Sequence, residues 1–268
     1  MSQRSSFRLL AVGAAGVAAA IATPAAFATQ AAPAAHSARP AQISAAMARQ
    51  ESHNLHKLLG GTNTSVESSN WSGYAATGAT GSFKSVSSSW VQPAVTCTSK
   101  STYSSYWVGL DGYSNSALEQ TGTEADCVGG KAEYGAWWEV LPAAESPYSV
   151  TVSPGDQLSA SVTDNGNGTF TMVLTDSTAG WSKSTTHAGS SGYQDSSAEV
   201  IAEATEVNGQ IAKLSDFGTV TFTGATAGGT ALGSLSPTEI IMEGSRDVKA
   251  QPGTISGGTF SDVWKAAS

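Results

Sequence analysis

The pattern of apolar and polar residues changes at about Glu67. Before that position, the only periodic stretch is an irregular apolar stripe over residues 43–59, which predicts a short helix. After it, Gly, Ser and Thr become abundant, and apolar residues alternate with polar ones. A period of two is typical of strands that face a core on one side only. No stretch after Gly61 has the pattern of an amphipathic helix, so the body of the protein is predicted to be all-β.

The alternating stretches are short and are separated by turn residues. The predicted strands cover residues 82–91, 106–110, 117–121, 134–141, 150–152, 158–162, 169–174, 198–204, 220–222 and 239–242. Residues 164–168 (Asp-Asn-Gly-Asn-Gly) tolerate positive φ and predict a hairpin between two of these strands. We find no repeat of fixed period. These features favour one antiparallel β-sandwich, in which two sheets bury their inner faces against each other.

The stretch of residues 106–122 is the centre of this organisation. It begins as a strand, breaks at the turn pair Asp111-Gly112, resumes at residue 117 and stops again at Thr121-Gly122. Gln120 lies near the end of the second run, where a strand can present a side chain to a cleft. A glutamine is neither acid nor base, but its amide can donate to an oxyanion and hold a water molecule. Catalysis at this position would therefore need a carboxylate from elsewhere, and we expect Glu203 to supply it.

Two predicted strands carry carboxylates in a pattern. Alternation places Glu199 and Glu203 on one face of their strand, opposite small apolar residues. In the same way Trp137 and Glu139 share a face, while Trp138 points to the other side. An aromatic ring beside a carboxylate on a concave sheet face predicts a substrate cleft. The alternative is that these glutamates line a solvated outer face, which is the commoner place for them.

The N-terminus has the plan of a secretory signal. Arg4 and Arg8 are followed by an apolar run over residues 9–22 and by Ala-Phe-Ala at residues 26–28, a typical cleavage site. The apolar run is too short to span a bilayer. Residues 1–28 are therefore predicted to be a signal peptide, and the mature protein is expected to be secreted, extracellular and free of the membrane.

The expected export also predicts the chemical state of the two cysteines, Cys97 and Cys127. In an oxidising compartment such a pair forms a disulfide more often than a metal or catalytic site, although two free buried thiols are the alternative. The bridge would enclose residues 106–122 and contribute about 3–4 kcal/mol on the chain-entropy model. Residues 29–66 are interpreted as a propeptide or disordered lead-in, and residues 67–268 as the β-sandwich domain.

Charge and histidine content exclude several kinds of function. The net charge is −8, and because the segment before Gly61 is basic, the body is more acidic still. There is no basic stripe for nucleic acid, and an acidic surface suits an acidic milieu. After Gly61 the only histidine is His187, in a stretch interpreted as a Ser/Thr-rich loop, so His-dependent nucleophiles and zinc sites are not expected. We expect no metal and no cofactor, and a monomer by default.

Five motifs occur in an order that resembles the eqolisin family of glutamic peptidases, over about Glu67 to the C-terminus. They are Ser69-Asn70-Trp71-Ser72-Gly73, Trp107-Val108-Gly109-Leu110-Asp111-Gly112, Gln120-Thr121-Gly122, Ala136-Trp137-Trp138-Glu139 and Ala198-Glu199-Val200-Ile201-Ala202-Glu203. The resemblance implies a concanavalin A-like jelly roll and an acid-acting endopeptidase of polypeptide substrates that needs no cofactor. It also implies that Gln120 and Glu203 form the catalytic pair, and that the substrate cleft is lined or supported by Trp71, Trp107, Asp111, Trp137 and Glu139.

The implied mechanism is a general-base attack by water. Glu203 would deprotonate the water, Gln120 would orient it and stabilise the oxyanion, and Glu203 would return the proton to the leaving amine. Glu119, next to Gln120, is expected to face the other way on the strand. One alternative is a glycosidase that uses two carboxylates, Glu139 with Glu203 or Glu199. Another is a non-catalytic sugar- or protein-binding module with Trp137 and its neighbours as the binding platform. For most of the tryptophans, a further alternative is that they are simply core residues.

Overall fold

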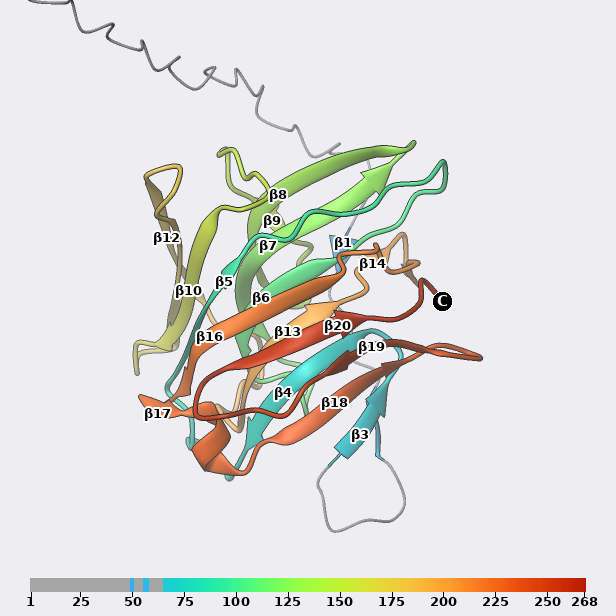
Figure 1. The fold of residues 1–268 in the computed structure, drawn as a ribbon. Coiled ribbons are helices and arrows are strands. Elements are labelled where there is room, and N and C mark those ends of the chain that lie inside the picture. Colours follow the sequence, from blue (N-terminus) through green and yellow to red (C-terminus); the bar gives the residue numbers. More distant parts are fainter. Residues whose placement is uncertain (1–48, 51–54, 58–64) are drawn as a thin grey trace, which may run out of the picture. The chain divides into compact units, whose positions relative to one another are not determined.

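Regular structure in the described part of the chain is almost entirely β-strand. The computed structural model describes Arg49–Gln50, Leu55–Lys57 and residues 65–268 (Figure 1). The elements are β1 (Arg49–Gln50), β2 (Leu55–Lys57), β3 (Ser65–Ser68), β4 (Trp71–Thr77), β5 (Ser85–Val91), β6 (Ser105–Leu110), β7 (Glu119–Val128), β8 (Lys131–Val140), β9 (Ser146–Pro147), β10 (Gln157–Asp164), β11 (Thr169–Asp176), β12 (Trp181–Ala188), β13 (Ser197–Glu203), β14 (Glu206–Val207), β15 (Gln210–Ile211), β16 (Thr219–Ala227), β17 (Thr230–Ala231), the single 3₁₀ turn η1 (Leu232–Leu235), β18 (Thr238–Glu243), β19 (Val248–Pro252) and β20 (Phe260–Trp264).

The strands form two packed layers, as the alternating pattern predicts. The first layer runs β9-β8-β7-β6-β13-β4, and the second runs β12-β11-β10-β5-β16-β20-β19. They are joined at β18, which pairs with β4 on one side and with β19 on the other. In Figure 1 the axes of β6, β13, β16 and β20 are roughly parallel to one another. β5, β10 and β11 of the second layer pack on β6 and β7 of the first, so the prediction of an all-β sandwich is confirmed.

Two separate groups of buried apolar side chains follow from this arrangement. The larger fills the space between the layers and includes Val200 and Ala202 of β13 and Val108 of β6. The smaller lies on the opposite face of the first layer and contains Val66, Trp71, Ala75, Trp107, Leu118, Trp137, Leu141, Ile201 and Ile240. Because strand side chains alternate, a strand can contribute to both groups. The face that carries the smaller group, which we call the tryptophan face, also carries the candidate site.

The central stretch differs from its prediction in one respect. β7 does not stop at Thr121-Gly122 but continues to Val128, because it pairs with β8 along ten residues. Gly122 lies inside the strand, where a Cβ would lie 2.2 Å from the carbonyl oxygen of Tyr106. The glycine therefore allows close packing and does not mark a turn. Cys97 and Cys127 form the predicted disulfide, which ties the chain before β6 to the end of β7.

Other predictions need correction. The described parts of the helix expected over residues 43–59 are the strands β1 and β2, and its other residues lie outside the described part of the chain. Residues 150–152 form no strand. The segment around His187, interpreted as a loop, is strand β12, and the exposed imidazole lies against Trp138 with ring centroids 5.3 Å apart. β12 is an edge strand with neither face deeply buried, and such strands show little alternation of apolar and polar residues. The sequence around His187 therefore did not predict a strand.

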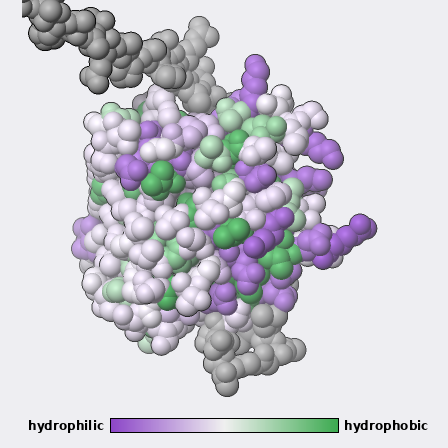
Figure 2. Space-filling model, in the orientation of Figure 1, coloured by the Kyte–Doolittle hydropathy of each residue, from purple (hydrophilic) through white to green (hydrophobic). Residues whose placement is uncertain are grey.

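The outer face of the second layer is lined by hydroxyl groups rather than charges. Thr171 and Thr186 bond across β11 and β12, and Ser87 and Thr226 bond across β5 and β16. Figure 2 shows a broad region of near-neutral hydropathy where β5, β10 and β16 lie in Figure 1. The predicted catalytic carboxylate, Glu203, belongs instead to β13 of the first layer.

Candidate active site

The tryptophan face brings together residues from five neighbouring strands. In an antiparallel pair, residues directly opposite each other point to the same side of the sheet. Glu203 lies opposite Trp71 of β4 and opposite Ser105 of β6, and Gln120 lies opposite Gly109 of β6 and opposite Glu139 of β8. Trp107 lies opposite Gly122, which in turn lies opposite Trp137. The registers thus place the predicted pair and four of the five predicted cleft residues on one face, as the resemblance implied.

Glu203 is held by two hydrogen bonds at the end of β13. The side-chain amide of Asn70 donates to its Oε1 at 2.7 Å, and the indole N–H of Trp107 donates to its Oε2 at 2.8 Å. The carboxylate is fully buried. Donors to both oxygens stabilise the charged form and fix the plane of the carboxylate. Glu203 is therefore oriented before any substrate arrives.

Asn70 is the residue of this site that the sequence reasoning missed. Its backbone N–H donates to Ser68 Oγ at 3.3 Å, and the Ser68 hydroxyl donates to Asn70 Oδ1 at 3.2 Å. Its carbonyl oxygen accepts from the N–H of Ala204, next to Glu203. With Oδ1 occupied by Ser68, the amide presents its N–H₂ group to Glu203. The Ser-Asn-Trp motif was the available signal, but nothing local indicated that its asparagine faces β13.

Gln120 is oriented by Glu139. Its Nε2 donates to Glu139 Oε2 at 2.6 Å, and both side chains are fully buried. Gln120 Oε1 has no hydrogen-bond partner among the residues the structure describes, and the same holds for the indole N–H of Trp137. Buried polar groups are nearly always hydrogen-bonded, so such atoms on one face indicate a place for a ligand or water. One remaining hydrogen of Nε2 and the lone pairs of Oε1 can serve that ligand.

Trp107 lies on β6 between Ser105, which is opposite Glu203, and Gly109, which is opposite Gln120. A Cβ at Gly109 would lie 2.9 Å from the Trp107 ring, and one at Gly122 would lie 2.6 Å from Trp107 Cβ. Glycine at these two positions therefore leaves room for Trp107, and Trp71 packs edge-on against its ring with ring centroids 5.1 Å apart. The tryptophans are buried, as the core alternative predicted, but Trp107 also donates to Glu203. Its two roles are compatible because the indole N–H lies at the edge of the ring.

Asp111 has a different environment from the other predicted cleft residues. Its carboxylate accepts hydrogen bonds from the backbone N–H groups of Gln194, Asp195 and Ser196 at 2.7–3.0 Å, and from the Asn115 amide at 2.8 Å. Asp111 itself has a φ of 66° and ends β6 in the turn predicted from the sequence. It fixes the loop that leads into β13, and therefore supports the position of the strand that carries Glu203.

Two further carboxyls are buried in the first layer, Glu199 on the tryptophan face opposite Gly109 and Glu119 on the other side of the sheet. Burial raises the pKa of Glu199 well above its ordinary value, with further repulsion from Asp111 and Glu119. Burial also raises the pKa of Glu119 to about 8, although the N–H of Ser190 donates to its Oε1 at 2.6 Å. Glu119 lies opposite Leu110, on the side of the sheet away from Gln120, as expected from alternation. Both groups are neutral in acid.

Two properties of the described residues bear on other functions. No helix there is long and apolar enough to cross a membrane. In the same part of the chain, His, Cys, Asp and Glu side chains form no group of three that could bind a metal ion.

An oriented carboxylate and an oriented carboxamide on one face of a β-sandwich define a hydrolase site based on carboxyl and amide groups. The chain belongs to the Peptidase A4 family, whose model matches residues 69–259. The protein is accordingly a peptidase, and its substrates are polypeptides. This sets aside the glycosidase and the binding-module alternatives.

Individual relatives agree with the family. The chain is 28% identical to aspergillopepsin-2 of Aspergillus niger over 212 residues, which are 69% of this chain and 74% of that protein. Among solved structures, scytalido-glutamic peptidase bound to a transition-state analogue inhibitor is similar, with a TM-score of 0.65 and 26% identity over 74% of this chain and 98% of the other. Aspergilloglutamic peptidase from Aspergillus niger has a TM-score of 0.56 and 28% identity over 61% of this chain and 99% of the other.

Proposed function

We propose that the protein is a secreted endopeptidase that works at acidic pH and uses Glu203 and Gln120 as its catalytic pair. The observation that carries this proposal is the orientation of both groups on one face. Glu203 is held by Asn70 and Trp107, while Gln120 is held by Glu139 and keeps an unbonded oxygen. The site thus has a base with fixed geometry and an amide with spare hydrogen-bonding capacity.

The reaction would use each group in turn. Glu203, as the carboxylate, takes a proton from a water molecule as the water attacks the scissile carbonyl. Gln120 accepts a hydrogen bond from that water through Oε1 and donates the free hydrogen of Nε2 to the oxyanion. A preorganised donor of this kind lowers the barrier by about 3–4 kcal/mol in other hydrolases. The protonated Glu203 then gives its proton to the leaving amine.

The surrounding side chains would bind the peptide. The indole N–H of Trp137 has no partner in the described part of the chain and is available to a substrate carbonyl. The rings of Trp71 and Trp107 offer apolar area for side chains on either side of the cleaved bond. Glu139 positions Gln120, and Asp111 holds the loop before β13, so we assign these two to support.

Acid action is favoured by the buried carboxyls. Burial raises the pKa of Glu119 to about 8 and also raises that of Glu199, so acid favours the neutral form of both in the folded protein. Neutral groups incur no penalty for a buried charge, whereas their ionisation at higher pH would destabilise the strands that carry the pair. The net charge of −8 acts in the same direction, because repulsion between surface charges decreases as acid protonates the carboxylates.

Residues 29–66 are proposed to be a propeptide that is removed after export. Its described strands lie close to the site in the pairing scheme. β1 pairs with β14, three residues after Glu203, and β2 pairs with β3, two residues before Asn70. The side chains of the site are fully buried. A peptide substrate can therefore reach them only if the tryptophan face becomes accessible. We expect the exported, active form to begin between Thr29 and Glu67, which N-terminal sequencing would test.

The catalytic assignment is tested with an unfolded protein substrate between pH 2 and pH 7. Gln120→Ala and Glu203→Gln should each lose activity by at least about 100-fold while their unfolding curves stay cooperative. Glu133→Gln, on β8 but away from the pair, serves as the matched control and should keep full activity. Activity that survives in the Gln120 or the Glu203 variant would rule out this pair.

A further inference from the structure

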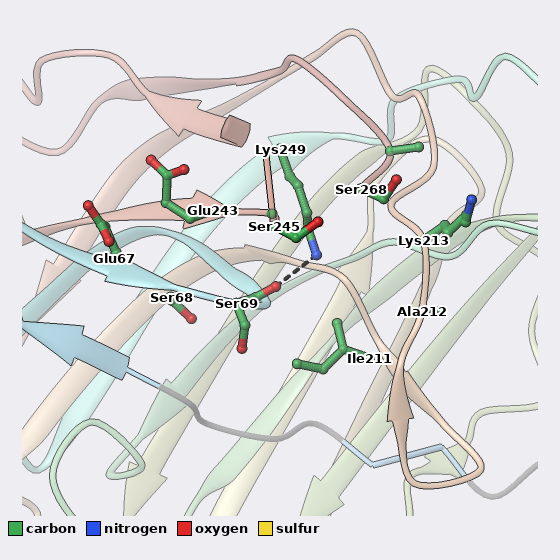
Figure 3. A pocket seen from close by; sticks show the side chains of 12 residues that line it. Glu67, Ser68, Ser69, Ile211, Ala212, Lys213, Glu243, Ser245, Lys249 and Ser268 are labelled. Carbon is green, nitrogen blue, oxygen red and sulfur yellow. Dashed lines mark hydrogen bonds between the residues drawn. The ribbon is translucent and has the colours of Figure 1, made fainter. Parts of the chain in front are cut away.

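A pocket lies beside the site, behind the residues that hold Glu203. Its volume is about 600 Å³, and it is lined by the turn between β3 and β4, the chain after β15 and the ends of β18 and β19. Figure 3 shows that Lys249 of β19 extends across this pocket towards Ser69. None of the groups assigned above to catalysis or substrate binding lines it, so the pocket needs its own explanation.

Lys249 is unusually buried for a lysine. Its side chain is only 5% exposed, and its Nζ donates to the carbonyl oxygen of Ser69 at 2.7 Å (Figure 3). Lysine is almost never so buried unless it is paired. Burial lowers the pKa of Lys249 to about 8, and attraction by Glu203 opposes that change. At acidic pH Lys249 is therefore a cation, close enough to Glu203 for the two charges to interact.

The contact with Ser69 connects Lys249 to Glu203 through the chain. Ser69 immediately precedes Asn70, whose amide holds Glu203 Oε1 at 2.7 Å. The turn is held from the other side by Ser68 Oγ, which accepts the N–H groups of Asn70 and Trp71. Lys249 is thus the contact from β19 that fixes the same turn. Moving the Ser69 carbonyl would move the donor that orients the carboxylate.

We propose that Lys249 is a positioning residue for Glu203, which holds the Ser69-Asn70 turn in place and supplies the positive charge that keeps the Glu203 carboxylate ionised in acid. This inference rests on the proposed role of Glu203 as general base. A base must be deprotonated at the working pH, and in acid that requires a nearby cation or strong donors. The attraction between the two groups is mutual, so the cation that Glu203 stabilises also stabilises the Glu203 carboxylate.

The other charged groups around Lys249 do not replace it. Glu67, Glu243 and Lys213 line the same pocket, and Lys213 is exposed. Burial and repulsion from Glu67 raise the pKa of Glu243, which makes it a weaker anion in acid. On the neighbouring strand β20, burial raises the pKa of Asp262 to about 7, so it is neutral in acid as well. Lys249 is thus the buried cation of this pocket at the pH of the proposed reaction.

The test is the pH profile of kcat/KM for Lys249→Met, measured beside the parent enzyme. Methionine retains the length of the side chain without its charge. We expect kcat to fall with little change in KM, and the acidic limb of kcat/KM to move up by about one pH unit, since an opposite charge within several ångströms shifts a carboxylic acid by at least that much. Lys249→Arg keeps a cation and should keep the limb of the parent. Lys213→Met removes the other lysine of the pocket and should leave the profile unchanged.

A second measurement covers the case in which Lys249→Met folds poorly. Lys249→Ala removes the atoms from Cγ to Nζ, and n-propylammonium has the same atoms. We expect this ion to restore kcat/KM several-fold and saturably in Lys249→Ala, and n-propanol at the same concentration to restore none. An acidic limb identical to that of the parent in Lys249→Met, or equal effects of the two additives, would overturn the inference. If Glu203→Gln or Gln120→Ala stayed active instead, the catalytic pair itself would be wrong, whatever Lys249 does.

Discussion

Glu119→Gln should make the stability of the protein much less dependent on pH. Glu119 is fully buried beside Gln120 but on the other side of the sheet, and its Oε1 accepts the N–H of Ser190. Glutamine has the same shape and can accept the same hydrogen bond through its own Oε1. The substitution therefore removes the ionisation of the carboxyl and keeps its packing.

The size and sign of the effect follow from the pKa of Glu119, which burial raises from 4.5 to about 8. Between these values the folded protein holds a proton that the unfolded chain has lost, so stability falls as pH rises. The contribution is complete below pH 4.5 and lost by about pH 8. A difference of about 3.5 pKa units corresponds to at most about 5 kcal/mol, at 1.36 kcal/mol per unit. At pH 8 Glu119→Gln should thus be several kcal/mol more stable than its parent, and at pH 4 the two should be alike.

The assay is urea unfolding at pH values from 3 to 8, with the midpoint and slope fitted at each pH. Both proteins should carry Glu203→Gln, so that proteolysis does not interfere. Asp247→Asn, which removes an exposed carboxyl, is the matched control and should follow its parent at every pH. If Glu119→Gln and its parent lost stability in parallel from pH 4 to pH 8, the assignment of the acid-favoured stability to Glu119 would be refuted.

Three further changes test the support of the site. Gly122→Ala would place a Cβ 2.2 Å from the carbonyl oxygen of Tyr106 and should lower the free energy of unfolding by about 1–3 kcal/mol or more, measured by urea unfolding. Asp111→Ala would leave the N–H groups of the loop before β13 without their acceptor, so we expect a loss of about 1–3 kcal/mol for each group left unsatisfied and a drop in kcat, read from unfolding and peptide cleavage. Cys97→Ser with Cys127→Ser should cost about 3–4 kcal/mol in thermal or urea unfolding, and an unchanged midpoint would contradict the bracing role of the bridge.

Sequence patterns predicted the local arrangement because neighbouring residues produce it. Alternation assigned Glu199 and Glu203 to one face of their strand, and the structure places both on the tryptophan face. The turn over residues 164–168 joins β10 to β11 as a hairpin, since Gly166 and Gly168 adopt its positive φ angles. The all-β class, the disulfide and the family motifs were equally accessible.

Contacts between distant strands were decided only by the tertiary structure. Asn70 contacts Glu203, and Lys249 contacts the neighbouring Ser69, because β4 and β19 pack together. The sequence around Asn70 or Lys249 carries no sign of these partners. For the same reason β7 extends past Gly122, where pairing with β8 outweighs the weak strand preference of glycine. A period-two pattern specifies which face a side chain takes, but the register of strands far apart in the chain is set by the packing of the whole sandwich. The sequence alone therefore identified the fold class and led to the proposed pair, and the tertiary structure showed which residues orient Glu203.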